Sequence, residues 1–310
     1  MPPPSRDAGI LTVAAIREAQ GRILFNEREQ IFALPETQAR DEIYRRLSEA
    51  LEKKLPVKAL LNPRRGIIQR LEPVSDREID EFRRALPPLE KAEKAMRVDV
   101  STIDPTRFNV VDHFLKVPVF KLCTKIVPSY AKAKEIFDFC AQQSCHLPGP
   151  PTVTPCIPFQ YVWDGCYARA HKMRKIITEN YGYCCEKVFS FAIDNNDELS
   201  VRADKWGGCC INWWYHVAPL IRVQVKILSV KFTLALVIDP SMFDKPVLLS
   251  SWLMAQENAA CSANPRVSMY TIQPGSAYTP ANGQGTAFNT DPAYTHTNQT
   301  LINYQNLTTC

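Results

Sequence analysis

The chain has 310 residues, of which 45% are hydrophobic and 22% are charged, and its formal net charge is +5. This composition is typical of a folded globular protein and excludes a mainly disordered chain. No run of 18 apolar residues occurs, which argues against a transmembrane helix, and the mild positive charge gives no electrostatic footprint for nucleic acid.

Cysteine and charge are distributed unevenly along the chain. All eleven cysteines lie at or after position 123. Residues 1–122 carry 22 Lys and Arg and 19 Asp and Glu, whereas residues 123–310 carry 15 and 13. Regions of such different chemistry indicate two domains, residues 1–122 and 123–310.

The first region has the patterns of a small α+β domain. The runs RILFN (22–26) and QIFAL (30–34) indicate strands, and VKALLNP with GIIQRLEPV indicates a hairpin around residues 62–66. Apolar positions spaced four apart predict a helix over residues 37–54; they are Ile43, Leu47, Leu51 and Leu55. An irregular connector is expected over residues 98–122. We find no catalytic constellation in this region.

A second helix is predicted just before Pro87. Ser75 and Glu78 have the spacing of a capping box, and we expect the helix to bury Ile79, Phe82 and Leu86. Nearer the N-terminus, the apolar run at residues 10–16 is too short for a signal peptide and lacks a preceding basic run. We therefore expect a secreted protein to have lost its signal from this chain.

The second region is predicted to contain two helices and several strands. One helix is expected at residues 129–143, with Ile136, Phe137 and Cys140 facing inward, and another from Cys166 to Gly182, with an inward stripe of Ala170, Met173 and Ile177. Strands are expected in EKVFSFAID, ELSVRAD, CINWWYHVAPLIRV, VKFTLALVID and VSMYTI, with a turn at residues 195–197. The polar tail after Pro240 is expected to wrap the sheet as loops.

The cysteines favour disulfides in an oxidising compartment. The chain has no CxxC pair, and its two CC dipeptides do not fit a zinc pattern, so no metal site is expected. Five bridges would leave one cysteine, either paired between chains or kept as a reactive thiol, and the count favours a reactive thiol. The proposed bridges are Cys145–Cys156, Cys123–Cys140 and, by remainder, Cys261–Cys310. Partners among Cys184, Cys185, Cys209 and Cys210 stay open.

Three residues form a candidate catalytic set. Cys166 begins a helix, where backbone N–H groups favour a thiolate and can hold an oxyanion. His216, in the strand WWYHVA, is a candidate base, and Asp239, ending the strand TLALVID, can orient its imidazole. His171 is a rival base, but it follows Cys166 by five residues and does not lie above the thiol. Each residue taken alone is more often a half-cystine, a core histidine or a cap.

Four segments resemble the motifs of the bacterial protein-glutaminase (protein-glutamine deamidase) family. They are DGCYARAHKMRKI (164–176), YGYCCEK (181–187), CCINWWYHVA (209–218) and VIDPSMF (237–243). The resemblance covers about residues 126–310 and implies catalytic roles for Cys166, His216 and Asp239. Residues 25–86 resemble, more weakly, the pro-region that covers the active site in this family.

The resemblance implies a papain- or transglutaminase-like catalytic domain, in which the helix bearing the cysteine packs on an antiparallel sheet. The expected reaction is hydrolysis of glutamine side-chain amides through a thioester, without metal or cofactor. Trp163, Trp213, Trp214 and Tyr215 are candidates to line the amide slot, although core packing is the simpler role for at least two of them. The alternatives are a cysteine peptidase or transglutaminase, or a disulfide-rich binding protein with a vestigial triad.

The same resemblance sets the expected partners and location. Substrates would be proteins or peptides with exposed glutamine, the pro-region would act as an intramolecular inhibitor, and a protease would activate the chain. We expect an extracellular bacterial monomer that binds neither nucleic acid nor membrane.

Overall fold

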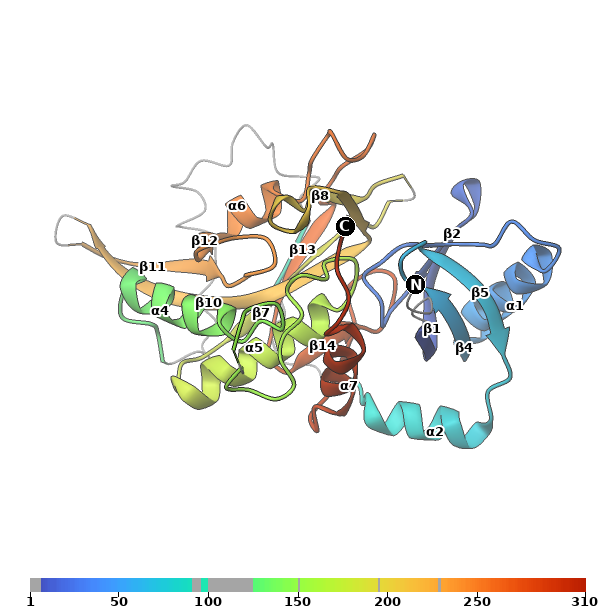
Figure 1. The fold of residues 1–310 in the computed structure, drawn as a ribbon, viewed down its shortest axis with the longest axis horizontal. Coiled ribbons are helices and arrows are strands. Elements are labelled where there is room, and N and C mark those ends of the chain that lie inside the picture. The colour runs from blue at the N-terminus through green and yellow to red at the C-terminus, as the bar shows by residue number, and fades with distance from the viewer. Residues whose placement is uncertain (1–6, 91–95, 100–124, 150, 195, 228–229) are drawn as a thin grey trace.

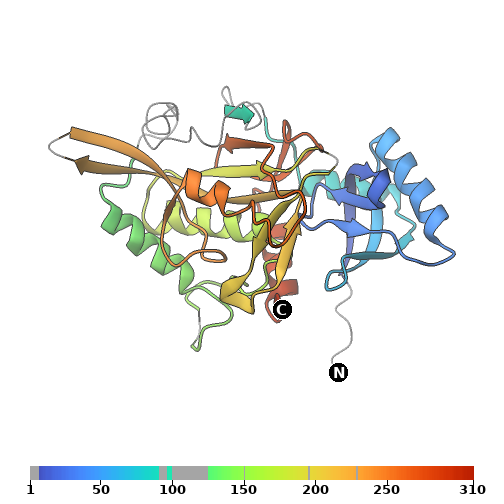
Figure 2. The same ribbon diagram turned by 90° about the horizontal axis from the view of Figure 1, so that it is seen from above.

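The computed structural model describes residues 7–90, 96–99, 125–149, 151–194, 196–227 and 230–310. A small barrel domain lies at one end of a larger domain built on a six-stranded sheet (Figures 1 and 2). Most of the expected connector, Cys123 and residue 195 of the expected turn lie outside the described residues.

The barrel closes in the strand order β1-β2-β3-β5-β4. Its strands are β1 (Asp7–Arg17), β2 (Arg22–Phe25), β3 (Phe32–Ala33), β4 (Pro56–Asn62) and β5 (Ile67–Glu72), with a 3₁₀ turn, η1 (Glu18–Gln20), after β1. The predicted strands and hairpin are confirmed. Sequence reasoning missed β1, whose alternating Leu11 and Val13 are buried in the barrel core.

Two helices accompany the barrel. Helix α1 (Arg40–Lys53) buries Ile43 and Leu47 as predicted, but Leu55 lies beyond its end and is exposed, because Lys54 takes a left-handed conformation that stops the helix. Helix α2 (Asp76–Ala85) has the predicted capping box. The expectation that α2 buries Ile79 and Phe82 was wrong: both are only partly buried, and the ring of Phe82 meets His296 of the larger domain.

The larger domain is an antiparallel sheet covered on both faces. Its strand order is β12-β11-β10-β7-β13-β6. The strands are β6 (Met96–Asp99), β7 (Glu186–Phe191), β10 (Tyr215–Ile227), β11 (Val230–Val237), β12 (Val247–Leu248) and β13 (Met269–Gln273). Strand β6 pairs with β13, so the first residues assigned to the connector belong to this sheet.

Helices α4 (Tyr130–Ala141) and α5 (Cys166–Asn180) cover one face of the sheet (Figure 1). The other face carries α6 (Leu249–Met254) and the hairpin of β8 (Leu199–Arg202) and β9 (Cys210–Trp213), whose connection contains the 3₁₀ turn η4 (Asp204–Trp206). Helix α7 (Thr295–Tyr304) packs beside α5, and β14 (Ala277–Pro280) pairs with β15 (Phe288–Thr290). The tail is thus more ordered than the loops expected from its polar sequence.

The predicted strand CINWWYHVAPLIRV is two strands in different sheets. The break falls at Trp214, whose backbone N–H donates to the carbonyl of Glu29 in the barrel domain at 3.1 Å. Strand β10 therefore begins at Tyr215, and His216 is its second residue. No helix within the described ranges is long and apolar enough to span a bilayer.

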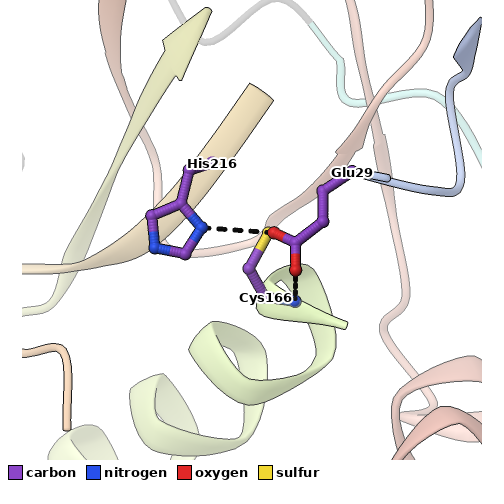
Figure 3. A group of neighbouring side chains, drawn as sticks. All are labelled: Glu29, Cys166 and His216. Carbon is purple, nitrogen blue, oxygen red and sulfur yellow. Dashed lines mark hydrogen bonds and ion pairs between the residues drawn. The ribbon is translucent and has the colours of Figure 1, made fainter. Parts of the chain in front are cut away.

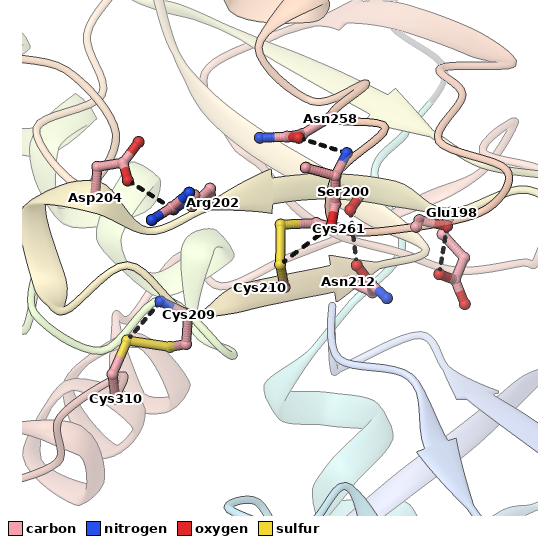
Figure 4. The surroundings of a disulfide bond; sticks show 12 residues. Glu198, Ser200, Arg202, Asp204, Cys209, Cys210, Asn212, Asn258, Cys261 and Cys310 are labelled. Atoms are coloured by element: carbon pink, nitrogen blue, oxygen red, sulfur yellow. Dashed lines mark hydrogen bonds and ion pairs between the residues drawn. A yellow bond between two sulfur atoms is a disulfide. The ribbon is translucent and has the colours of Figure 1, made fainter.

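The disulfides follow the sequence prediction only in part. Cys145–Cys156 is confirmed, but Cys310 pairs with Cys209 and Cys261 with Cys210, which overturns Cys261–Cys310 (Figure 4). Both bridges tie the β8–β9 hairpin to distant segments. Cys184 is also disulfide-bonded.

The expected bridge Cys123–Cys140 was wrong because Cys140 is a free thiol in the core. Cys166 and Cys185 are free as well, so the described residues hold three thiols rather than the single one expected from the odd count. Counting by parity fails where small apolar thiols serve as core residues.

We expect the Cys209–Cys310 bridge to contribute more to stability than Cys145–Cys156. Their separations are 101 and 11 residues, and the entropy that a bridge removes from the unfolded chain grows with loop length. The double variant C209S/C310S should lose about 4.7 kcal/mol of unfolding free energy and C145S/C156S about 2.8 kcal/mol. Urea unfolding of both variants measures this; equal losses would contradict the prediction.

Candidate active site

Cys166 is the first residue of helix α5. Gly165 caps this helix with φ 89°, and a Cβ there would lie 2.9 Å from the ring of Tyr304, so the turn requires glycine. The position at a helix N-terminus favours an anion near the thiol. In the structure, however, burial raises the pKa of Cys166 well above its usual value, and the neighbouring Glu29 raises it further against the opposing effect of Arg169.

His216 lies between Asp239 and the Cys166 helix. Its Nε2 is 2.9 Å from Oδ2 of Asp239, and its Nδ1 faces Cys166 and Glu29. The Cys166 sulfur, a His216 ring nitrogen and a Glu29 carboxylate oxygen all lie within 4.8 Å of one another. The structure therefore brings together Cys166, His216 and Asp239, the three residues singled out from the sequence.

Aromatic rings fix the plane of the imidazole. Trp213 stacks on His216 with a centroid distance of 4.4 Å and an angle of 8°, and Trp252 of α6 lies on the ring at 5.4 Å and 23°. Trp213 is held in turn by a 3.0 Å hydrogen bond from its Nε1 to the carbonyl of Val162. Because the two tryptophans stack on the imidazole, its interactions with other groups are made by the ring nitrogens Nδ1 and Nε2.

The buried carboxylate of Asp239 accepts hydrogen bonds from several neighbouring side chains. Trp252 Nε1 donates to its Oδ2 at 2.9 Å, and the Ser241 hydroxyl donates to its Oδ1. Burial alone would raise the pKa of Asp239, but the hydrogen bonds from His216, Ser241 and Trp252 lower it to about 2. For His216, burial acts in the opposite direction and lowers the pKa. The hydrogen bonds to Asp239 and Glu29 outweigh burial and raise the pKa of His216 above its usual value.

A carboxylate from the barrel domain occupies the site. Glu29, on the loop between β2 and β3, accepts the backbone N–H of Cys166 on Oε1 at 3.1 Å and lies 3.2 Å from Nδ1 of His216 through Oε2 (Figure 3). Arg169, one turn along α5, reaches Oε1 at 3.3 Å. Glu29 is fully buried, so these neighbours rather than water surround its carboxylate.

The backbone of the same loop is bound as well. The Glu29 N–H donates to Oδ1 of Asp164 at 3.0 Å, and Gln30 forms an antiparallel bridge with Trp213. Trp214 Nε1 donates to the carbonyl of Arg28 at 2.7 Å, and the Tyr215 hydroxyl lies 3.4 Å from the carbonyl of Asn26. The loop thus lies across the site and is held there by both backbone and side-chain hydrogen bonds.

The four aromatic candidates from the sequence have different environments. Trp214 and Tyr215 contact the inserted loop, whereas Trp213 supports His216. Trp163 donates its Nε1 to the carbonyl of Thr309 at 2.8 Å and so holds the C-terminal segment. Trp214 and Tyr215 therefore contact the loop through their side chains, whereas Trp213 meets it through its backbone bridge with Gln30.

His171 is bound into a separate buried network. Its Nδ1 is 2.7 Å from Lys187 Nζ, and its Nε2 is 3.2 Å from the carbonyl of Asp291. Burial and the nearby Lys187 and Arg174 lower the pKa of His171 to about 2, so this ring stays neutral. In the described part of the chain, both ring nitrogens of the rival base His171 are thus engaged by Lys187 and Asp291.

Sequence reasoning missed Glu29 and Arg169. Arg169 follows Cys166 by three residues, which places both on one face of α5, so spacing could have identified it. Nothing near Glu29 in the sequence distinguishes it from the many other acidic residues of the first region. Its role depends on how the two domains dock.

Glu29, Cys166 and His216 have donor atoms close enough together to ligate a metal ion. Their direct hydrogen bonds to one another, to Arg169 and to Asp239 account for the arrangement without one. The grouping has the parts needed for acyl transfer: a nucleophile, an oriented base and a backbone donor for an oxyanion.

Comparison with known proteins finds matches along the whole chain. The family model described as Glutaminase matches residues 133–256. A crystal structure of pro-protein-glutaminase is 27% identical, covers 99% of this chain and 95% of its own, and has a TM-score of 0.70. No curated protein matches the chain.

Two structures of protein-glutaminase match a smaller share of the chain at higher sequence identity. A crystal structure of protein-glutaminase is 34% identical and covers 60% of this chain and 92% of its own, with a TM-score of 0.50. An NMR structure of protein-glutaminase from Chryseobacterium proteolyticum is also 34% identical and covers 60% and 91%, with a TM-score of 0.50.

We expect Glu29 to suppress the reactivity of Cys166 in the intact chain. The variant E29A removes the carboxylate that raises the pKa of Cys166 and opens space beside the sulfur, so iodoacetamide should modify Cys166 at least about tenfold faster. Mass spectrometry of the labelled peptides measures the rate at each thiol.

Two controls separate this effect from unfolding. Buried Cys185 should stay unreactive in E29A, and the exposed-site variant E36A should leave Cys166 as slow as in the natural chain. An unchanged Cys166 rate in E29A would contradict the prediction.

Proposed function

The chain belongs to the protein-glutaminase family, enzymes that act on glutamine side-chain amides, and we propose that it is the inhibited precursor of a deamidase using Cys166, His216 and Asp239. The observation that carries the proposal is the side chain in the site. Glu29 is a glutamate, the product of glutamine deamidation, and its carboxylate contacts both the Cys166 N–H and His216.

In the proposed reaction, the Cys166 thiolate attacks the carboxamide carbon of a substrate glutamine. The resulting oxyanion lies where Oε1 of Glu29 now lies, on the Cys166 N–H and near Arg169. His216, which takes the proton of the Cys166 thiol, passes it to the amide nitrogen; the C–N bond breaks, ammonia departs and a thioester remains on Cys166.

Hydrolysis of the thioester then completes the cycle. His216 takes a proton from water as the water attacks the thioester carbon, and glutamate leaves as the thiol is restored. Asp239 keeps the imidazole in place and stabilises its positive charge through both steps. The Asp239 geometry, with three donors on one carboxylate, supports this role.

The site favours a side-chain amide over a main-chain one. A side chain, not a backbone carbonyl, reaches the Cys166 N–H, which disfavours the peptidase alternative. A Cys-bearing helix packed on an antiparallel sheet that supplies the histidine also supports placing the domain with the papain and transglutaminase enzymes. The disulfides support an extracellular location.

We propose that the barrel domain inhibits the enzyme by holding Glu29 in the site. A carboxylate resists thiolate attack and has no ammonia to lose, so Glu29 blocks the site without being consumed. It also pairs with His216 in place of the thiolate, which keeps Cys166 protonated.

A second contact holds the barrel in position. Arg17 donates to the carbonyls of Asp197 and Ala192 at 2.6 and 2.8 Å, and Arg22 pairs with Glu198. A protease acting between the two domains would release these contacts from their tether and so activate the enzyme.

Replacing Cys166 tests the reaction. After limited proteolysis of the full chain, C166S should release ammonia from a glutamine-containing protein at least about 10³-fold more slowly than the natural sequence, because the nucleophile is lost. The matched control C185S replaces another buried thiol and should keep its activity. Mass spectrometry of the treated protein distinguishes deamidation from cleavage and cross-linking, and either of the latter would refute the assignment.

Replacing Glu29 with its amide tests the inhibitory contact. In E29Q the amide carbon lies beside Cys166, so we expect the chain to deamidate its own residue 29 and restore glutamate. The mass of the peptide containing residue 29 reports the conversion. The double variant E29Q/C166S should keep its glutamine; persistence of glutamine in E29Q alone would contradict the proposed position of the substrate.

A further inference from the structure

The residue before Glu29 is also bound by the larger domain. Arg28 Nε lies 3.3 Å from Oδ2 of Asp164, and its Nη1 lies 3.0 Å from the hydroxyl of Tyr167. The side chains of Arg28 and Asp164 are 11% and 1% exposed, so solvent screens this ion pair only weakly. Asp164 directly precedes the Gly165 cap of helix α5, and Tyr167 is the second residue of that helix.

Asp164 contacts two consecutive residues of the loop. Its Oδ1 accepts the backbone N–H of Glu29 at 3.0 Å, while Oδ2 faces Arg28 and accepts the Tyr304 hydroxyl at 2.7 Å. Arg169 donates to the backbone carbonyl of Asp164 and not to its carboxylate. The carboxylate charge therefore remains available to a cation on the loop.

The chain fixes Asp164 relative to the nucleophile. Asp164 precedes Cys166 by two residues, and the left-handed turn at Gly165 sets the geometry between them. A bound segment that follows Glu29 places one side chain at Cys166 and the backbone N–H of the same residue at Asp164. The residue before it then lies where Arg28 lies, with its side chain near the Asp164 carboxylate.

We propose that Asp164 and Tyr167 select substrates in which an arginine directly precedes the target glutamine. The inference rests on the proposed function, because it takes Glu29 as the position of the target residue. Asp164 is then a specificity-determining residue that binds the backbone of the target and the side chain of its neighbour.

The two contacts favour arginine over lysine. A guanidinium offers donors in a fixed planar fork, so one nitrogen can meet the carboxylate while another meets the phenol. A lysine ammonium is a single point charge and can satisfy both only with less favourable geometry. A glutamate at the same position would bring two carboxylates together.

A peptide series tests the preference on the full chain activated by limited proteolysis. The peptides are acetyl-Ala-Xaa-Gln-Gly-amide with arginine, lysine, citrulline or glutamate at Xaa, and kcat/KM is measured from ammonia release. We expect the arginine peptide to exceed citrulline, its uncharged isostere, by roughly tenfold, with glutamate lowest, and added salt to reduce the difference.

The ratio of kcat/KM for the arginine and citrulline peptides is then compared between variants. D164N should bring the ratio close to one, whereas D244N removes a carboxylate that pairs with Lys205 elsewhere on the domain and should leave the ratio unchanged. Because the readout is a ratio, a loss of total activity in D164N does not affect it.

The outcomes separate this inference from the proposed function. Equal kcat/KM for arginine and citrulline in the activated natural sequence overturns the role of Asp164 while deamidation stands. Release of ammonia from none of the peptides or from intact protein substrates overturns the proposed function itself. A ratio unchanged by D164N assigns the preference to other residues and also overturns the inference.

Discussion

The docking of the barrel domain on the larger domain centres on the contacts of the buried Glu29 carboxylate. This carboxylate compensates the N-terminus of α5, the guanidinium of Arg169 and the imidazole of His216, none of which is accessible to water. Removing the carboxylate would leave the Cys166 N–H without this acceptor and would take one anionic neighbour from Arg169 and His216 in the protein interior, which is costly. The same groups, the Cys166 N–H and Arg169, would stabilise the oxyanion of a tetrahedral intermediate.

The barrel makes that contact specific. Glu29 lies on a short loop between β2 and β3, and closure of the sheet through β1, β4 and β5 holds both ends of the loop. The arginine contacts at the end of β1 and the start of β2 fix the orientation of the barrel on the larger domain. Because the barrel already holds the loop in place, Glu29 binds in the site without the entropy loss of ordering a free peptide.

Local sequence patterns singled out Cys166, His216 and Asp239, which the structure brings together, but they did not single out the barrel loop that contacts them. The helix opened by Cys166, the strand of His216 and the strand end at Asp239 each have a local signature, and the motif DGCYARAH even contains Arg169 at a helical spacing. Glu29 has none, because docking of another domain determines its position. The Cys209–Cys310 bridge was equally hidden, since it depends on where the C-terminal segment passes the β8–β9 hairpin.

In the proposed mechanism, the same carboxylate contact inhibits strongly when Glu29 makes it and only weakly when a product glutamate makes it, because Glu29 alone is tethered to the site. A glutamate released from a substrate presents the same carboxylate to Cys166 N–H and His216, but nothing holds it there once its own chain departs. Glu29 is covalently linked to its site, so its effective concentration is of the order of millimolar or higher, and the barrel contacts raise it further. In the proposed mechanism, Glu29 therefore inhibits the enzyme as a tethered product group while the free product does not, and activation follows from the loss of the tether and of the Arg17 and Arg22 contacts.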